Sequence, residues 1–383
     1  MADYKKGPFG SALKKSIFVP KDDSTVKVYE QQNAINKDWK LERYFITKEY
    51  AEKLKGFKVS AGDIIVSCAG TIGEIYELPM DAESGIINQA LMRIRVHEDR
   101  INKKMFIILF TNMIDEFTRV HSNGSAIKNI PPFSDLKPMK VLVPTFDEQN
   151  KIAHYFYELD NLITLHQRKC EETKKLKKYM LQKMFPQNGK RVPEIRFAGF
   201  TDDWEQRKYA EVIELLSGQD FNPEEYNEDG IGIPYLTGAS CIENGCTTAV
   251  RWTEKPRCIA EKGDTVLVCK GSGYGTIATV NQEKAHIARQ FMALKVKKHE
   301  LDNRFNYFLL NSVVENIKTD ARGLIAGIAR DAVLKQEIVI PCLNEQTKIG
   351  EYFENLDRLI TLHQRKYEEL QKIKKFMLQN MFI

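Results

Sequence analysis

The stretch "LITLHQRK" occurs twice in this chain, at residues 162–169 and again at residues 359–366. A shift of 197 positions aligns the surrounding segments, 144–185 and 341–382, with 27 of 42 positions identical by direct count. A repeat of this extent indicates a duplicated structural element, and its period decides how the rest of the sequence is divided.

Each copy of the repeat predicts a long amphipathic helix. Its apolar residues recur at steps of three and four, which places one side chain per turn on a single face, as in the seam of a coiled coil. A stripe of this length must be buried, and its twin is the obvious partner. We expect the two helices to pair antiparallel through these positions: Leu159, Leu162, His166, Leu176, Met180, Leu356, Leu359, His363, Leu370, Ile373 and Met377.

Two of these positions are histidines, His166 and His363. A metal-binding or catalytic role is one interpretation, but neither residue has a Cys, His or Asp at ligand spacing. A polar seam residue that fixes the register of the helices is the favoured interpretation.

Composition limits the class of protein. With 383 residues, 43% hydrophobic and 28% charged, the chain suits a soluble protein of two or three domains. It has no run of eighteen apolar residues that could span a membrane, and its start, "MADYKKGPFG", lacks the apolar segment of a secretory signal. Seven cysteines without a C-x-x-C pair predict reduced thiols in a cytoplasmic protein.

The net charge of +5 is mild, but basic residues are unevenly distributed. Residues 168–191 contain nine basic residues and two acidic ones. Two interpretations stay open: a solvated helix face, or a contact with nucleic acid or an acidic protein.

A fainter repeat lies outside the helices. "GDIIVSCAG" (62–70) parallels "GDTVLVCKG" (263–271), and both patterns predict a strand followed by a glycine-rich turn. Residues 103–120 and 302–318 have helical patterns, so we expect two compact α+β heads. The helices are nearly identical whereas the heads have diverged, which indicates that the heads act on different but related targets.

This layout resembles the specificity subunit of type I restriction-modification systems. The resemblance rests on the duplicated "P-x-x-x-E-Q-x-K-I … LITLHQRK … MLQ-x-MF" helices and on "VPEIRFAGFTDDWEQRK" (192–208), and it covers nearly the whole chain. It implies two target-recognition domains, at 1–142 and 190–339. These are separated by a central helix at 143–189 and a C-terminal helix at 340–383, which form an antiparallel coiled coil with pseudo-twofold symmetry.

The resemblance also implies a function. Such a subunit reads a bipartite site on double-stranded DNA, one half per recognition domain. It holds two adenine-N6 methyltransferase subunits and the endonuclease (translocase) subunits. It binds no cofactor itself: S-adenosylmethionine, ATP and Mg²⁺ are expected on the partner subunits. A helix of about thirty residues is roughly 45 Å long, which would hold the two readers about thirteen base pairs apart.

One feature departs from the family pattern. A block like 192–208 normally opens the first half too, and by the repeat offset it would lie around Met1, where it is missing. Either the natural start lies upstream, or the gene was shortened or recombined.

Amide and basic side chains on loops are the usual readers of base edges in the major groove. The candidate DNA-contacting residues of the first half are Lys14, Lys15, Gln31, Gln32, Asn33 and Lys128. The three lysines among them could hold phosphates. The candidates of the second half are Thr237, Ser240, Asn244, Lys270, Ser272, Tyr274, Arg289, Gln290, Arg322 and Arg330. For each of these residues a solvated or turn-stabilising role is the alternative.

Motifs that would make the chain an enzyme are incomplete. "GSGYG" (271–275) lacks the spacing of a dinucleotide-binding loop, and "NIPPF" (129–133) has Ile130 where an amino-methyltransferase needs a polar residue. "DTVLVCK" (264–270) has Val268 in place of the second carboxylate of a metal nuclease. We therefore expect a non-catalytic DNA-reading subunit, with a stand-alone methyltransferase or nuclease and a coiled-coil adaptor as the alternatives.

Overall fold

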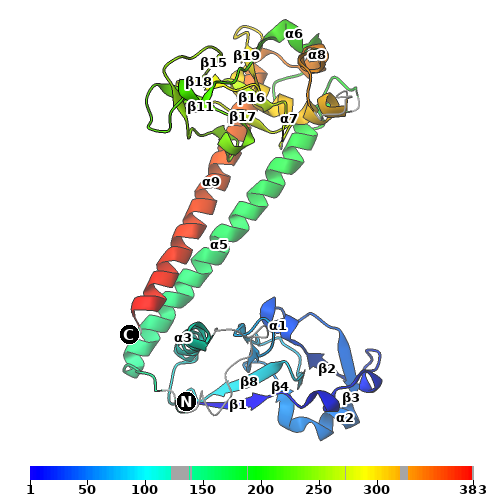
Figure 1. Ribbon diagram of the computed structural model, residues 1–383. Coiled ribbons are helices and arrows are strands. Elements are labelled where there is room, and N and C mark those ends of the chain that lie inside the picture. Colours follow the sequence, from blue (N-terminus) through cyan, green and yellow to red (C-terminus); the bar gives the residue numbers. More distant parts are fainter. Residues whose placement is uncertain (122–137, 139, 188, 272, 320–326, 382–383) are drawn as a thin grey trace. The chain divides into compact units, whose positions relative to one another are not determined.

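The computed structural model describes residues 1–121, 138, 140–187, 189–271, 273–319 and 327–381. It divides into two compact units, one made of Met1–Thr164 with Tyr367–Ile383 and the other of Leu165–Lys366. Each unit contains one α/β head and part of both long helices, α5 (Phe146–Met184) and α9 (Leu343–Asn380), as Figure 1 shows. The mixed α/β class predicted from the sequence is confirmed.

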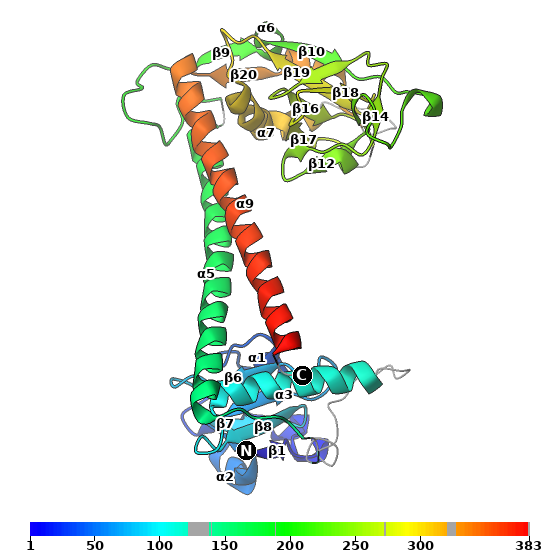
Figure 2. The ribbon, with the colours of Figure 1, turned by 90° about the vertical axis from the view of Figure 1, so that its left-hand side faces the viewer.

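The head of the first unit contains two four-stranded sheets. The first sheet has the order β1 (Ala2–Lys6), β8 (Leu91–Val96), β5 (Ile64–Ser67), β6 (Ile75–Glu77). The second has the order β3 (Tyr44–Thr47), β2 (Thr25–Tyr29), β7 (Gly85–Ile87), β4 (Lys58–Val59), in which β2 and β7 are parallel. Helix α3 (Lys103–His121) lies across the first sheet (Figure 2) and buries Phe110 against Ile64 and Val66 of β5. The short helices α1 (Gln31–Ile35) and α2 (Lys48–Lys53) complete the head.

The head of the second unit is larger. Its first sheet has the order β10 (Ile213–Ser217), β19 (Phe291–Val296), β16 (Thr265–Val268), β17 (Ile277–Thr279), β13 (Cys246–Thr247), β12 (Ile242–Glu243). Its second has the order β14 (Trp252–Thr253), β11 (Ile233–Leu236), β18 (Lys284–Ile287), β15 (Ile259–Glu261). Helix α7 (Asn303–Thr319) packs on β16, β17 and β19. The remaining elements are α6 (Tyr209–Val212), α8 (Arg330–Lys335) and the paired strands β9 (Glu205–Lys208) and β20 (Glu337–Ile340).

The two heads repeat one topology. The order β1-β8-β5-β6 recurs as β10-β19-β16-β17, and β3-β2-β7-β4 recurs as β14-β11-β18-β15. The parallel pair β2 and β7 recurs as β11 and β18. Because Ser67 opposes Leu91 and Val268 opposes Phe291, the register fixes which residues of the heads are equivalent. Gln89 therefore corresponds to Arg289, and Ala90 corresponds to Gln290, although each half has a glutamine nineteen residues after the last glycine of "GDIIVSCAG" or "GDTVLVCKG".

A repeated glutamine fastens each head to its long helix. In the first unit, Gln149 accepts a hydrogen bond from the Asn102 amide at 2.9 Å and donates to the Pro144 carbonyl at 3.0 Å. In the second, Gln346 bonds the Asp302 amide at 2.9 Å and the Pro341 carbonyl at 2.9 Å. Both glutamines are buried, so these bonds satisfy backbone groups that would otherwise lack a partner. The duplicated glutamine thus has the same structural role in both copies.

The long helices contact each other within each unit. In the first unit, the Lys374 ammonium lies 2.5 Å from Asp160, and Phe156, Leu159 and Leu370 form a buried cluster. In the second unit, the Lys177 ammonium lies 2.6 Å from Asp357, and the two Nδ1 atoms of His166 and His363 are 3.0 Å apart. As the residue number rises along α5, the number of its partner in α9 falls, so the pairing is antiparallel there.

Four residues expected in the helix seam are exposed. Leu162, Leu176, Leu359 and Ile373 keep 43%, 44%, 40% and 37% of their surface accessible. The contacts instead follow steps of three and four residues in α5 from Phe156 through Leu159, Ile163 and His166 to Cys170, and Lys177 lies seven residues further on. In two places sequence reasoning preferred the apolar residue beside a lysine, Leu176 before Lys177 and Ile373 before Lys374. The lysine lies at the seam because its ammonium pairs with an aspartate of the other helix. Of the other expected positions, Leu159, Leu356 and Leu370 are buried, and Met180 and Met377 are half-buried.

Candidate nucleic-acid interface

Polar side chains gather where several strands of the second head end. Ser217 closes β10, Thr237 follows β11, Lys270 follows β16, and Arg289 with Gln290 follows β18. Arg330 opens α8 and donates a hydrogen bond from Nη1 to the Ser217 hydroxyl at 3.1 Å, which brings it to the same end. We call this group, together with Ser240, the sheet-end surface of the second unit. Ser240, Lys270, Arg289 and Arg330 are exposed on it.

Gln290 occupies the centre of this surface. A Cβ atom on Gly238 would lie 2.3 Å from Gln290 Oε1, and one on Gly271 would lie 3.5 Å from it. The Gln290 carbonyl also accepts the Cys269 amide at 2.7 Å, which ties the β16 turn to the segment before β19. The side chain is therefore held between two glycine-containing turns, and larger residues there would displace it.

A buried histidine, His286 in β18, supports the neighbouring loop. Its Nδ1 accepts the amides of Arg257 and Cys258 at 3.2 and 3.1 Å, so Nε2 donates to the Gln219 carbonyl at 2.7 Å. Burial lowers the pKa of His286, and the ring stays neutral in this tautomer. Sequence reasoning missed this residue because only the tertiary contact distinguishes it from a core histidine.

Arg289 is positioned by that same loop. Its guanidinium lies 2.7 Å from the Asp220 carboxylate, and its amide donates to the same carboxylate at 3.0 Å. The Arg289 side chain nevertheless remains 73% exposed, so its charge stays available to an anionic partner.

The first head presents its own side chains at the equivalent end. Gln31 and Gln32 open α1 directly after β2, and Gln89 follows β7. Gln32 is exposed, whereas Gln31 has a buried Oε1 without a hydrogen-bond partner among the described residues. Phe9, which sequence reasoning did not select, is 90% exposed two residues after Gly7. An aromatic residue between Pro8 and Gly10, directly after a strand, is the signal that could have found it.

A shared glycine lies at the same place in both heads. A Cβ on Gly7 would lie 1.8 Å from the Asn88 carbonyl oxygen, and a Cβ on Gly218 would lie 2.0 Å from the Ala288 carbonyl oxygen. Each glycine lets the strand end pass directly against the segment that carries Gln89 or Arg289. The backbone of the two ends is therefore alike, and their difference lies in the side chains.

Three of the expected DNA-contacting residues have other roles or lie elsewhere. Asn33 is 2% exposed, and its amide bonds Glu30, Asp38 and Leu41 of the backbone, so it stabilises the α1 turn. Asn244 lies beside the C-terminal end of β17, which is the opposite end of the sheet from Lys270, since β16 and β17 are antiparallel.

The third is Tyr274, which turns toward α7, with the Lys318 ammonium 5.4 Å from its ring centre. Among the remaining candidates, Lys14 and Lys15 are exposed before β2, whereas Lys128, Ser272 and Arg322 lie outside the described residues.

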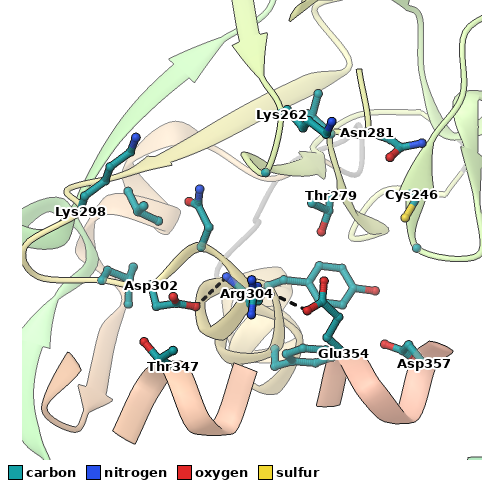
Figure 3. A pocket seen from close by; sticks show the side chains of 18 of the residues that line it. Cys246, Lys262, Thr279, Asn281, Lys298, Asp302, Arg304, Thr347, Glu354 and Asp357 are labelled. Atoms are coloured by element: carbon teal, nitrogen blue, oxygen red, sulfur yellow. Dashed lines mark hydrogen bonds and ion pairs between the residues drawn. The ribbon is translucent and has the colours of Figure 1, made fainter. Parts of the chain in front are cut away.

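The second unit also has a hollow of roughly 730 Å³ at the opposite end of its first sheet, shown in Figure 3. Arg304 there pairs with Glu354 at 3.3 Å, and its amide donates to Asp302 at 2.9 Å. Acidic and basic groups are mixed around this hollow and partly pair with each other. In the part of the chain that the structure describes, no group of three or more His, Cys, Asp or Glu residues could hold a metal ion.

Over the described ranges, no helix is both long and apolar enough to cross a membrane.

The chain matches the model of the type I restriction modification DNA specificity domain twice, over residues 9–175 and 201–372. The chain belongs to this family. Two curated relatives from Methanocaldococcus jannaschii are similar along most of their length. The putative type I restriction enzyme MjaX specificity subunit is 25% identical over 85% of this chain and 78% of the relative. The type I restriction enzyme MjaVIII specificity subunit is 23% identical over 93% and 91%.

Solved structures show the same fold. A crystal structure of the type I restriction-modification S subunit from M. genitalium covers 100% of this chain and 94% of its own, with a TM-score of 0.64 at 18% identity. A chain from a structure concerned with complex assembly and conformational transition of the type I system covers 99% and 96%, with a TM-score of 0.53 at 15% identity. The resemblance stated from the sequence is thus confirmed: this is a type I specificity subunit.

Proposed function

We propose that this specificity subunit reads a bipartite DNA site, one half with each head, and that each head uses its sheet-end surface. The observation that carries the proposal is the repeated topology, in which matching strand ends present different side chains. The first head offers the amides Gln31, Gln32 and Gln89, whereas the second offers the cations Lys270, Arg289 and Arg330. Amides pair with adenine, and arginine or lysine with guanine, so two such ends suit two different half-sites.

Charge reversal at Lys270 tests the surface of the second head. We expect Lys270→Glu to weaken binding to the cognate duplex at least tenfold, because it removes a cation and adds an anion beside the phosphates. Lys262→Glu is the matched control, since Lys262 is an exposed lysine that lines the hollow at the opposite end. Equal losses in both variants, measured by fluorescence anisotropy at fixed salt, would contradict the assignment.

Exchange of a whole head tests the division of the site. Replacement of residues 1–142 by the same region of a relative should change one half of the recognised sequence. Changes in both halves would contradict modular reading. A gel-shift series with shuffled half-sites separates this function from a coiled-coil adaptor, which would show no sequence dependence.

We further propose that α5 and α9 form a pseudo-twofold coiled coil that sets the spacing of the half-sites. The contacts that support it obey the 197-residue offset: Asp160 corresponds to Asp357, Lys374 corresponds to Lys177, and His166 corresponds to His363. An insertion of one helical turn in both helices should change the spacer length that the complex accepts.

The same helices would hold two methyltransferase subunits. Outside the seam they expose apolar residues in matched pairs, at 43% and 40% for Leu162 and Leu359, and at 51% and 63% for Tyr179 and Phe376. Exposed apolar side chains at equivalent positions suit two copies of one partner. Of the basic stretch 168–191, Lys177 and Lys183 pair with carboxylates within the chain, and Lys174, Lys175 and Lys178 remain exposed for a partner.

In this proposal the subunit is not catalytic. S-adenosylmethionine would bind the methyltransferase subunits, and ATP and Mg²⁺ would bind the partners that cleave DNA. The purified chain should transfer no methyl group and cut no DNA until those subunits are added. Activity of the chain alone would instead favour a stand-alone methyltransferase or nuclease.

A further inference from the structure

The first head carries an aromatic side chain on its outside, three residues after β1. This residue is Phe9, and 90% of its surface is accessible. Single exposed apolar side chains are common on proteins, so exposure alone indicates no ligand. Three further features of Phe9 do indicate one: its place in the head, the fixed turn that carries it, and the charge around it.

Phe9 lies at the same end of the head as the amides proposed to read bases. A Cβ on Gly7 would lie 1.8 Å from the Asn88 carbonyl oxygen, so the two segments pass directly against each other. The Asn88 amide in turn donates to the carbonyl of the last residue of β2 at 3.0 Å. Gln89 follows Asn88, and Gln32 lies three residues after β2; both are exposed. The chain segments that carry Phe9, Gln89 and Gln32 therefore meet at one place.

The turn that carries Phe9 is held on both sides. Before it, the Gly7 amide donates to the Leu91 carbonyl at 2.8 Å, which continues the pairing of β1 with β8. After it, the Ala12 amide donates to the Phe9 carbonyl at 2.8 Å, and the Tyr50 hydroxyl donates to the Ala12 carbonyl at 2.8 Å. Because the backbone is already ordered, only the side-chain torsions of Phe9 are fixed on binding, which keeps the entropic cost low.

The charge around Phe9 favours an anionic partner. Residues 4–21 contain five lysines and no acidic residue, and all five lysines are exposed. The stretch that follows the equivalent glycine of the second head, residues 219–229, contains five acidic residues and no basic one. Lysines beside an exposed aromatic ring suit a partner that carries phosphates next to flat apolar groups. The first of these two stretches therefore suits DNA, and the second does not.

The equivalent position of the second head has another chemistry. Because Gly7 corresponds to Gly218, Phe9 corresponds to Asp220, whose carboxylate lies 2.7 Å from the Arg289 guanidinium. The Asp220 side chain is 41% exposed although residues 191–208 precede its strand, so this place is open in both heads. One head offers an apolar ring where the other offers a charged pair.

We propose that Phe9 is a specificity-determining residue of the first head, and that its ring packs on the C5 methyl group of a thymine in the major groove. This inference rests on the proposed function, in which Gln32 and Gln89 pair with adenine. An A·T pair presents the adenine amino group and N7 beside the thymine O4 and methyl group, and phenylalanine is one of the side chains that contact this methyl group. The amides and the ring would thus read the two partners of A·T pairs.

Replacement of thymine by deoxyuridine tests the contact, because it removes only the methyl group. The full-length chain, assembled with its methyltransferase subunits, is titrated with duplexes in which each thymine of one half-site is replaced in turn. The half-site is the one that changes when residues 1–142 are exchanged. We expect one position at which binding weakens about three- to fivefold, which is the effect of one buried methyl group. In Phe9→Ala the thymine and deoxyuridine duplexes should bind equally well.

Met80→Ala is the matched control. Met80 is 87% exposed in the same head but follows β6, and the pairing of β1, β8, β5 and β6 places the end of β6 opposite the end of β1. This variant should keep the full sensitivity to deoxyuridine. Both substituted side chains are exposed, so equal melting temperatures of the two variants and the unsubstituted chain should confirm that folding is unchanged.

Three results would overturn the role of Phe9 while leaving the reading of two half-sites intact. These are a first half-site without a sensitive thymine, equal sensitivity in Phe9→Ala and the unsubstituted chain, and a Phe9→Ala variant that binds DNA normally but no longer assembles with the methyltransferase subunits. The last result would assign the ring to a protein contact. Binding that depends on the sequence of neither half-site would instead overturn the proposed function, and the thymine contact with it.

Discussion

Glu148 and Glu345 have the same place in the two copies of one helix, yet their surroundings are opposite. Glu345 is fully buried beneath Arg196, and Glu148 is exposed. The glutamines that follow them, Gln149 and Gln346, have instead kept the same bonds. A duplicated sequence therefore preserves contacts made within the repeat, whereas contacts made to residues outside it, such as Arg196, can differ between the two copies.

The largest effect on stability is expected at the buried ion pair of Arg196 and Glu345 in the second unit. Arg196→Ala should lower the free energy of unfolding by about 3–5 kcal/mol, because it leaves the buried Glu345 carboxylate unpaired. Glu148→Gln should change it by less than about 0.5 kcal/mol, since that carboxylate is exposed. Urea unfolding followed by tryptophan fluorescence can separate the units, because Trp204 and Trp252 lie in the second and Trp39 in the first.

Similar losses for the two substitutions would mean that Glu148 has a buried partner as Glu345 does. That result would contradict the difference in burial between these two equivalent positions.

Gly7 and Gly218 have equivalent surroundings in the two heads, so the same substitution at each should lower stability by a similar amount. Gly7→Ala and Gly218→Ala each place a methyl group within 2.0 Å of a carbonyl oxygen and should each cost about 1–3 kcal/mol. Gly10→Ala is the control, because a Cβ there would meet no atom within 4 Å. A loss confined to one head in thermal unfolding would show that the strand ends are not built alike.

Much of the architecture could be predicted from the sequence because it is periodic. The 197-residue repeat predicted both long helices, and "GDIIVSC" with "GDTVLVC" predicted the equivalent strands β5 and β16. The helix seam was harder, because a lysine with an aspartate partner can occupy a seam position that an adjacent leucine seems to fit better. Lys177 shows this directly, since its partner Asp357 is 180 residues away.

The candidate site was predicted less well, for a physical reason. An amide such as Asn33 has the right chemistry for a base edge, but its hydrogen bonds to the backbone are visible only once the chain is folded. Asn244 is exposed, but it lies at the opposite end of its sheet from the surface that we propose binds DNA. Side-chain type indicates what a residue can bind, and strand direction decides where it does so.

The two equivalent ion pairs of the helices should differ slightly in their contributions to the free energy of unfolding. Lys177 and Asp357 are 19% and 39% exposed, whereas Lys374 and Asp160 are 33% and 52% exposed. Lys177 also lies 5.2 Å from the ring centre of Phe308. We expect Lys177→Ala to cost about 1 kcal/mol and Lys374→Ala about half as much. Lys178→Ala, at an exposed position, is the control, and a larger cost for Lys374→Ala in urea titrations would contradict the ranking.

The smallest effect concerns His166 and His363, which are equivalent residues of the two copies and contact each other. Their Nδ1 atoms share one hydrogen bond, which requires one ring to accept, and Lys169 and Lys366 are the cations nearby. Burial, and then the neighbouring His363, lowers the pKa of His166 in the folded chain. Between that lowered value and the ordinary value near 6.5, the unfolded chain binds more protons, so stability rises with pH. The contribution of the neutral His166 ring to the free energy of unfolding is complete above about pH 6.5 and is lost as the pH falls below that value.

The double substitution His166→Gln with His363→Gln should reduce this dependence, because a glutamine carries no titrating proton. Between pH 7.5 and pH 5.5 we expect the melting temperature of the unsubstituted chain to fall about 1–3 °C more than that of the double variant. His154→Gln, an exposed histidine of α5, should keep the full dependence. An unchanged dependence in the double variant would assign the pH effect to groups other than the helix seam. A dependence lost in the double variant would mean that the residue pair at the centre of the repeat makes the helix contact sensitive to pH.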